Sequence, residues 1–126
     1  MIKFHQDKVL LLHQLLIEQT GGEAGVRDFG LLDSALQACY ATFDGKELFP
    51  TKEEKAARLA CGLVSNHAFV DGNKRIGMYV LLAFLELNGI YLQITDEDII
   101  TVGLQLAERQ MQYEDLLQWI LDHETV

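Results

Sequence analysis

One stretch of the sequence limits the possible folds more than any other: residues 76–87 are almost entirely apolar. A helix that is apolar on every side belongs in the middle of a domain, because each face must be covered. The run is too short to cross a bilayer, which needs about 20 apolar residues. We therefore expect a central helix over residues 74–88. Its apolar members are Ile76, Met78, Val80, Leu81, Leu82, Ala83, Phe84, Leu85 and Leu87.

Other parts of the chain show the apolar spacing of helices that cover such a core. The pattern predicts helices over residues 7–20, 29–43, 51–67 and 113–123, and one more that starts at Thr95. Thr51 and Glu54 have the spacing of a capping box. His13 and Trp119 lie on apolar faces and are expected to be core residues. A chain of 126 residues suits one domain, so we predict an all-α, compact, single-domain bundle of about six helices over residues 1–126.

Charge and cysteine content exclude several functional classes. The formal net charge of −9 argues against a general affinity for nucleic acid, which needs a basic face. The N-terminal residues are polar and show no secretion signal. We expect Cys39 and Cys61 to be buried free thiols in a reducing compartment. These features predict a cytoplasmic protein without a membrane or nucleic-acid partner.

A short loop before the apolar helix carries the chemistry. Residues 67–75 read His-Ala-Phe-Val-Asp-Gly-Asn-Lys-Arg. Lys74 and Arg75 lie at the expected buried start of the helix, where the helix dipole disfavours cations. A phosphate bound between them and the free backbone N–H groups would explain both charges, and Asp71 can hold the Mg²⁺ that accompanies nucleotides. The alternative is a plain turn in which Asn73 caps the helix and both cations are solvated.

The spaced pattern in this loop resembles the signature of the Fic/Doc (Fido) family, in its Doc (death-on-curing) form. The matching residues are His67, Phe69, Asp71, Gly72, Asn73, Lys74 and Arg75. The general family pattern is similar to His-Pro-Phe-x-x-Gly-Asn-Gly-Arg, and the Doc branch has Lys in place of the second Gly. Gly21-Gly22, residues 26–36 and Asn88-Gly89 extend the resemblance over the whole chain. It implies the helical Fic/Doc fold.

Each loop residue has a role in phosphoryl or nucleotidyl transfer that its chemistry permits. Imidazole titrates near neutrality, so His67 can take the proton from a Ser or Thr hydroxyl of a target protein. Asp71 is the carboxylate of the loop and the candidate Mg²⁺ ligand. The candidate phosphate-binding residues are Gly72, Asn73, Lys74 and Arg75, and the candidate catalytic residues are His67, Asp71, Lys74 and Arg75.

Lys74 decides which reaction the resemblance implies. In adenylylating relatives a Gly at this position leaves room for the α-phosphate of ATP. The Lys of the Doc branch implies that ATP binds reversed, with its γ-phosphate facing His67, so that a protein hydroxyl is phosphorylated. For Doc the implied target is elongation factor Tu, whose modification stops translation. Two alternatives stay open: a protein adenylyltransferase of the Fic type, and a non-catalytic nucleotide-sensing domain.

The resemblance also implies partners. Residues 43–50 read as a connector with a turn at Asp44-Gly45, and the comparable family segment is a flap that aligns the target polypeptide. The flap residues would be Lys46, Glu47, Leu48 and Phe49; a plain surface loop is the alternative. The inhibitory Ser/Thr-x-x-x-Glu-Gly/Asn pattern of many Fic proteins is absent from the sequence, which predicts a cognate antitoxin acting in trans. Arg27 and Asp28 are read as a family match or as a cap with a structural ion pair.

Overall fold

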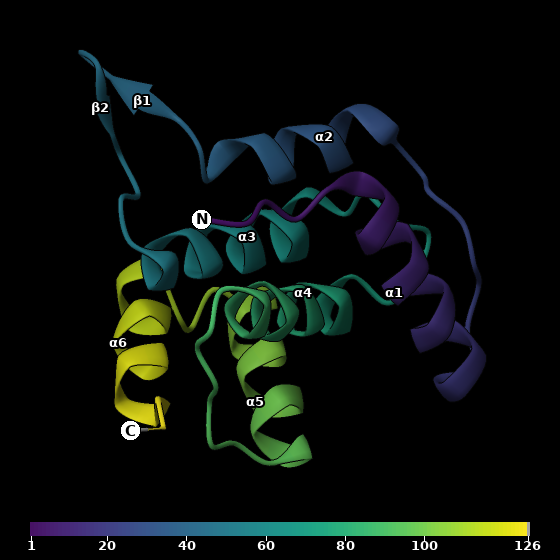
Figure 1. Cartoon of the computed structure of the whole chain (residues 1–126). Coiled ribbons are helices and arrows are strands. Elements are labelled where there is room, and N and C mark those ends of the chain that lie inside the picture. The colour runs from purple at the N-terminus through teal and green to yellow at the C-terminus, as the bar shows by residue number, and fades with distance from the viewer. Residues whose placement is uncertain (126) are drawn as a thin grey trace.

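The computed structural model describes residues 1–125, and these residues form six α-helices and one short β-hairpin (Figure 1). The helical fold confirms the predicted fold class, and the hairpin is the one strand structure within this range. The elements in chain order are α1 (Gln6–Thr20), α2 (Phe29–Ala38), β1 (Thr42–Phe43), β2 (Lys46–Glu47), α3 (Lys52–Asn66), α4 (Asn73–Leu87), α5 (Asp96–Ala107) and α6 (Tyr113–His123).

The apolar helix α4 lies at the centre, beside α3, as its sequence predicts. Figure 1 shows α2 on one side of this pair, α5 and α6 on the other, and α1 along the flank. One face of α4 reaches the surface at Tyr79, which is 37% exposed. The remaining helices contribute to the same core, including Ile99 of α5 and Leu116 of α6. The buried residues of α4 are Ile76, Gly77, Met78, Val80, Leu81, Phe84 and Leu85.

The close approach of α3 and α4 depends on Gly77. A Cβ atom at this position would lie 2.6 Å from the Cγ2 atom of Val64 and 3.1 Å from the carbonyl oxygen of Ala60. Both neighbours belong to α3, and one of them is backbone. The two helices therefore pack at a distance that a side chain at residue 77 would not permit.

The expected end of the second helix at residue 43 is wrong: α2 ends at Ala38, and a hairpin follows. The backbone φ angles of Asp44 and Gly45 are 53° and 76°, which is the geometry of a two-residue hairpin turn. Thr42 and Phe43 pair with β2 and cannot continue a helix. The Asp44-Gly45 turn was predicted, but the strands on either side of it were not.

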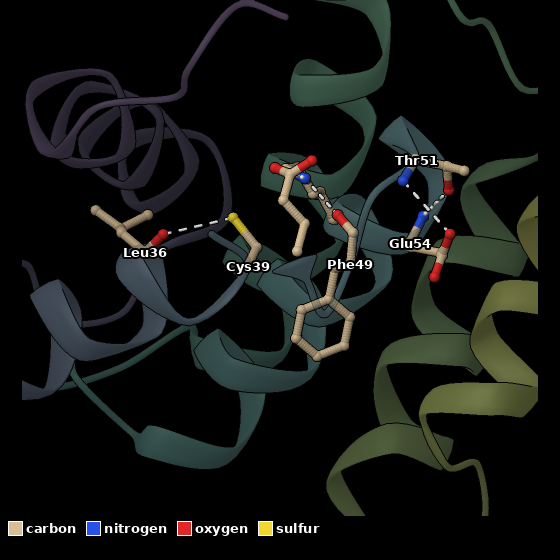
Figure 2. Close-up of polar contacts among 7 residues, drawn as sticks. Leu36, Cys39, Phe49, Thr51 and Glu54 are labelled. Carbon is tan, nitrogen blue, oxygen red and sulfur yellow. Dashed lines mark hydrogen bonds and ion pairs between the residues drawn. The ribbon is translucent and has the colours of Figure 1, made fainter. Parts of the chain in front are cut away.

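The start of α3 follows its sequence signal. The Glu54 N–H donates to the Thr51 hydroxyl oxygen at 3.1 Å, and the Thr51 N–H donates to the Glu54 carboxylate at 3.4 Å (Figure 2). This reciprocal capping box satisfies two N–H groups that a helix start leaves free. Since α3 ends at Asn66, it fixes where the loop with the candidate site residues begins.

Candidate active site

The loop between α3 and α4 opens into a cavity of about 620 Å³. All the residues to which the sequence assigned catalytic or phosphate-binding roles line this cavity. The end of α1 and one face of α5 complete its walls. The lining residues are Ile17, Thr20, Gly21, Gly22, His67, Val70, Asp71, Gly72, Asn73, Lys74, Arg75, Ile99, Ile100, Gly103 and Leu104.

The first turn of α4 presents free donors and two cations to the cavity. Gly72 takes the N-cap position with φ 78° and no side-chain cap. Within residues 1–125, the backbone N–H groups of Asn73, Lys74 and Arg75 have no hydrogen-bond partner. The side chains of Lys74 and Arg75 are exposed, so the prediction of a buried helix start is wrong. The helix opens onto the cavity instead, and its dipole adds to the two positive charges.

Asp71 is held by backbone N–H groups from both sides. One carboxylate oxygen accepts the Gly72 N–H at 2.8 Å, and the other accepts the Glu23 N–H at 3.3 Å. Each carboxylate oxygen keeps a second lone pair for another partner. The described part of the chain has no cluster of three metal-ligating side chains. A single oriented carboxylate fits a Mg²⁺ ion whose other ligands are phosphates and waters, because nucleotide-borne Mg²⁺ is bound in this way.

His67 follows the last residue of α3 in a left-handed backbone conformation, with φ 52°. A residue other than glycine pays about 1–3 kcal/mol for this conformation. The Arg27 Nε–H donates to the His67 carbonyl at 2.8 Å. The imidazole is exposed and makes no hydrogen bond to any residue from 1 to 125. It is therefore free to accept a proton from a molecule in the cavity.

Asn73 fixes the shape of the loop with its side chain. Its amide oxygen accepts the Phe69 N–H at 3.0 Å, and its amide nitrogen donates to the Phe69 carbonyl at 3.0 Å. Phe69 itself is buried. Asn73 therefore keeps two donors for a phosphate: its backbone N–H and the second N–H of its side-chain amide nitrogen.

Residues 22–28 form a strap that runs alongside the loop, and the sequence did not predict this placement. Val26 and Phe69 form an isolated antiparallel bridge. The Val70 N–H donates to the Gly25 carbonyl at 3.1 Å, and the Arg27 N–H donates to the Ala68 carbonyl at 2.7 Å. These contacts join residues more than forty positions apart, so no local pattern reports them.

Arg27 and Asp28 have separate roles in this strap. Asp28 caps α2 by accepting the Leu31 N–H at 3.0 Å, as the sequence predicts. The expected ion pair is wrong: the guanidinium of Arg27 donates to the carbonyls of His67 and Asn66, at 2.8 and 3.4 Å. A cation at the C-terminal end of α3 satisfies carbonyls that the helix leaves free and complements its dipole.

The structure does not bring the expected flap to the cavity. Lys46, Glu47, Leu48 and Phe49 are not among the lining residues. The hairpin lies at the N-terminal end of α3 and the loop at its C-terminal end (Figure 1). A helix rises about 1.5 Å per residue, so the length of α3 separates them by roughly 22 Å. The structure thus places residues 46–49 away from the cavity, and the segment beside the loop is the strap. A target-docking role of residues 46–49 stays a prediction.

The fold and the arrangement of the loop agree with what comparison with known proteins finds. Residues 3–85 match the model of the Fic/DOC family, and the chain belongs to this family. Over 72 residues the chain is 47% identical to Toxin Doc of Mycolicibacterium smegmatis. This alignment covers 57% of this chain and 55% of that protein. The match thus spans little more than half of its relative. It confirms the resemblance to the Doc branch.

Proposed function

We propose that this chain is the toxin of a toxin–antitoxin module and acts as a protein kinase of the Doc type. It transfers the γ-phosphate of ATP to a Ser or Thr hydroxyl of a target protein. The observation that carries this proposal is the meeting, in one cavity, of an unpaired imidazole, an oriented carboxylate and a helix start with two free cations. The whole chain, residues 1–126, is the proposed Fic/Doc domain, since α5 supplies a wall of the same cavity.

The reaction assigns each group a step. The γ-phosphate binds at the first turn of α4, where free N–H groups, Lys74 and Arg75 neutralise its charge. His67 takes the proton of the target hydroxyl, and the hydroxyl oxygen forms a bond to the γ-phosphorus. At the same time the bond between the γ-phosphorus and the β–γ bridging oxygen breaks, and ADP leaves. General base catalysis of this kind contributes about 10²–10⁴-fold. Mg²⁺ bound beside Asp71 would supply further charge neutralisation to the phosphates.

Lys74 favours γ-phosphate transfer over adenylylation in this proposal. Its side chain lines the cavity at the second residue of α4, where the adenylylating relatives have glycine. An ammonium group there occupies space and adds positive charge. It thus favours binding of the γ-phosphate, which carries more negative charge than the α-phosphate. The proposed target is elongation factor Tu, whose modification would block translation.

Labelled ATP tests the reaction. We expect γ-labelled ATP, but not α-labelled ATP, to label elongation factor Tu in the presence of Mg²⁺. The His67→Ala variant should lose labelling by at least about 100-fold, whereas His5→Ala, an exposed histidine away from the cavity, should keep it. Label from the α-position would replace the kinase with the adenylyltransferase. Absence of both labels would leave the non-catalytic, nucleotide-sensing domain as the better description.

The proposal includes a cognate antitoxin that blocks the cavity near Lys74 and Arg75, and a cytoplasmic site of action. The net charge of −9 does not favour a nucleic-acid partner. None of the helices in residues 1–125 is long and apolar enough to span a membrane.

Expression of the chain alone should arrest growth, and co-expression of its antitoxin should restore it. Normal growth with a catalytically competent chain alone would contradict the toxin assignment.

A further inference from the structure

Helix α1 makes a direct contact with the candidate metal-binding residue. The Nε2 atom of His13 lies 2.7 Å from the backbone carbonyl oxygen of Asp71. His13 is 3% exposed and therefore part of the interior, as its sequence position predicts. A carbonyl oxygen can only accept a hydrogen bond, so the imidazole carries a proton on Nε2 and donates it.

The same imidazole packs on the loop. Its ring stacks on the ring of Phe69, with centroids 3.8 Å apart and an interplanar angle of 14°. Phe69 is the residue to which Asn73 is bonded through both side-chain atoms. His13 therefore touches the loop at two points, and the proton donation and the stacking can be separated by substitution.

A second contact fixes the carboxylate of Asp71. Gly22 has φ 103°, and a Cβ atom there would lie 2.5 Å from the Oδ2 atom of Asp71. The same oxygen accepts the Glu23 N–H. A side chain at residue 22 would have to displace the carboxylate. The absence of a side chain at Gly22 thus permits the observed position of Asp71.

We propose that His13 and Gly22 are positioning residues for Asp71. The His13 N–H holds the backbone of Asp71, and the space at Gly22 lets the Glu23 N–H orient its carboxylate. The metal part of this inference rests on the proposed function, in which Asp71 meets nucleotide-borne Mg²⁺. Hydrogen-bonded supports of this kind commonly contribute 10–100-fold to metal affinity.

Two substitutions at residue 13 separate the donor from the ring. In His13→Gln the amide nitrogen lies as many bonds from Cα as Nε2 does, so the donor is kept and the ring is lost. In His13→Phe the ring is kept and the donor is lost. We expect His13→Phe to weaken Mg²⁺ binding in the presence of a non-hydrolysable ATP analogue by about tenfold or more, and His13→Gln to stay close to the unsubstituted chain. Titration calorimetry at several Mg²⁺ concentrations measures this.

Substitution of the glycine tests the second contact. Gly22→Ala should weaken Mg²⁺ binding by a similar factor. The matched control is Gly89→Ala, because Gly89 also has a positive φ of 86° but a Cβ atom there has no neighbour within 4 Å. Both variants introduce backbone strain, but the new methyl group displaces the Asp71 carboxylate in Gly22→Ala and contacts nothing in Gly89→Ala. Equal Mg²⁺ affinity of the two variants would overturn the role of Gly22.

Amide hydrogen exchange distinguishes failure of this inference from failure of the proposed function. The Gly72 N–H donates to the Asp71 carboxylate, so it should exchange faster in His13→Phe and at the original rate in His13→Gln, without any ligand. Unchanged exchange in His13→Phe, or faster exchange in His13→Gln alone, would show that the ring acts by packing and would overturn the inference. Faster exchange in His13→Phe with no Mg²⁺–nucleotide binding by the unsubstituted chain would keep the positioning role and reject the proposed function.

Discussion

At the scale of single residues, Gly77 shows how strongly the core limits the sequence. Its neighbours Val64 and Ala60 leave no room for a methyl group. Asn73 and Gly22 show the same dependence at the cavity, where one side chain and one missing side chain set the loop geometry. Gly77 and Gly22 meet residues from other segments of the chain, whereas Asn73 bonds Phe69 within the same loop.

Gly77→Ala should therefore destabilise the protein despite the better helix propensity of alanine. Overpacking of a core costs about 1–3 kcal/mol, whereas the propensity gain is about 1 kcal/mol. Urea unfolding measures the net loss. The unsubstituted chain is the reference, because Gly30 in α2, the other candidate for a control, has its Cβ direction blocked by the Asp28 oxygen that caps α2. A Gly77→Ala variant as stable as the unsubstituted chain would mean that α3 and α4 can separate without loss of stability.

At the scale of elements, a buried cation of α3 contacts the hairpin and the segment that follows it. The Nζ atom of Lys55 in α3 lies 2.9 Å from a carboxylate oxygen of Glu47 in β2. It also donates to the Phe49 carbonyl, drawn in Figure 2. The side chain of Lys55 is 2% exposed and that of Glu47 is 51% exposed. The hairpin thus depends on a contact that no local sequence pattern reports.

Lys55→Met should lower the free energy of unfolding by about 1–3 kcal/mol, because the Phe49 carbonyl loses its donor. Glu47→Gln should cost less than Lys55→Met, because the amide oxygen of the new side chain can still accept a hydrogen bond from the Lys55 ammonium. Urea unfolding compares the two variants. In both, labelling by ATP should persist, since the hairpin is remote from the cavity. A Lys55→Met variant that folds stably but cannot label would restore a direct role for the hairpin.

The sequence predicted those elements whose signals are local. The capping box of Thr51, the turn at Asp44-Gly45 and the apolar run of α4 each need only neighbouring residues, and all three were found. The contacts of His13 and Arg27 with the loop join distant segments and had no such signal. The distance between residues 46–49 and the cavity could be predicted, because the predicted helix over residues 51–67 already separates them from His67 by about 25 Å.

At the scale of the whole molecule, two free thiols link stability to alkaline pH. Cys39 is buried as expected, whereas Cys61 is only partly buried, so the expectation of two buried thiols is wrong for Cys61. Burial raises the pKa of Cys39 and the pKa of Cys61 from 9.0 to about 11 each. In the unfolded chain these thiols ionise near pH 9, while in the folded chain they stay neutral. Their contribution is therefore complete below pH 9 and is lost as the pH rises towards 11. Each thiol can account for at most about 1.4 kcal/mol per pH unit in this range.

The Cys39→Ala/Cys61→Ala variant should be less stable at neutral pH, because it leaves cavities, but its stability should fall less steeply between pH 9 and pH 11. Thermal unfolding at a series of pH values measures both curves. Parallel curves would show that the two thiols ionise equally readily in the folded and unfolded states.

The left-handed backbone at His67 has a consequence for how the protein would change under selection. Glycine adopts this conformation without strain, and asparagine adopts it more readily than most residues. Replacing His67 by glycine would therefore relieve backbone strain while removing the proposed proton acceptor. A screen of variants for protein abundance alone should thus enrich His67→Gly, whereas a screen for the proposed activity should retain His67.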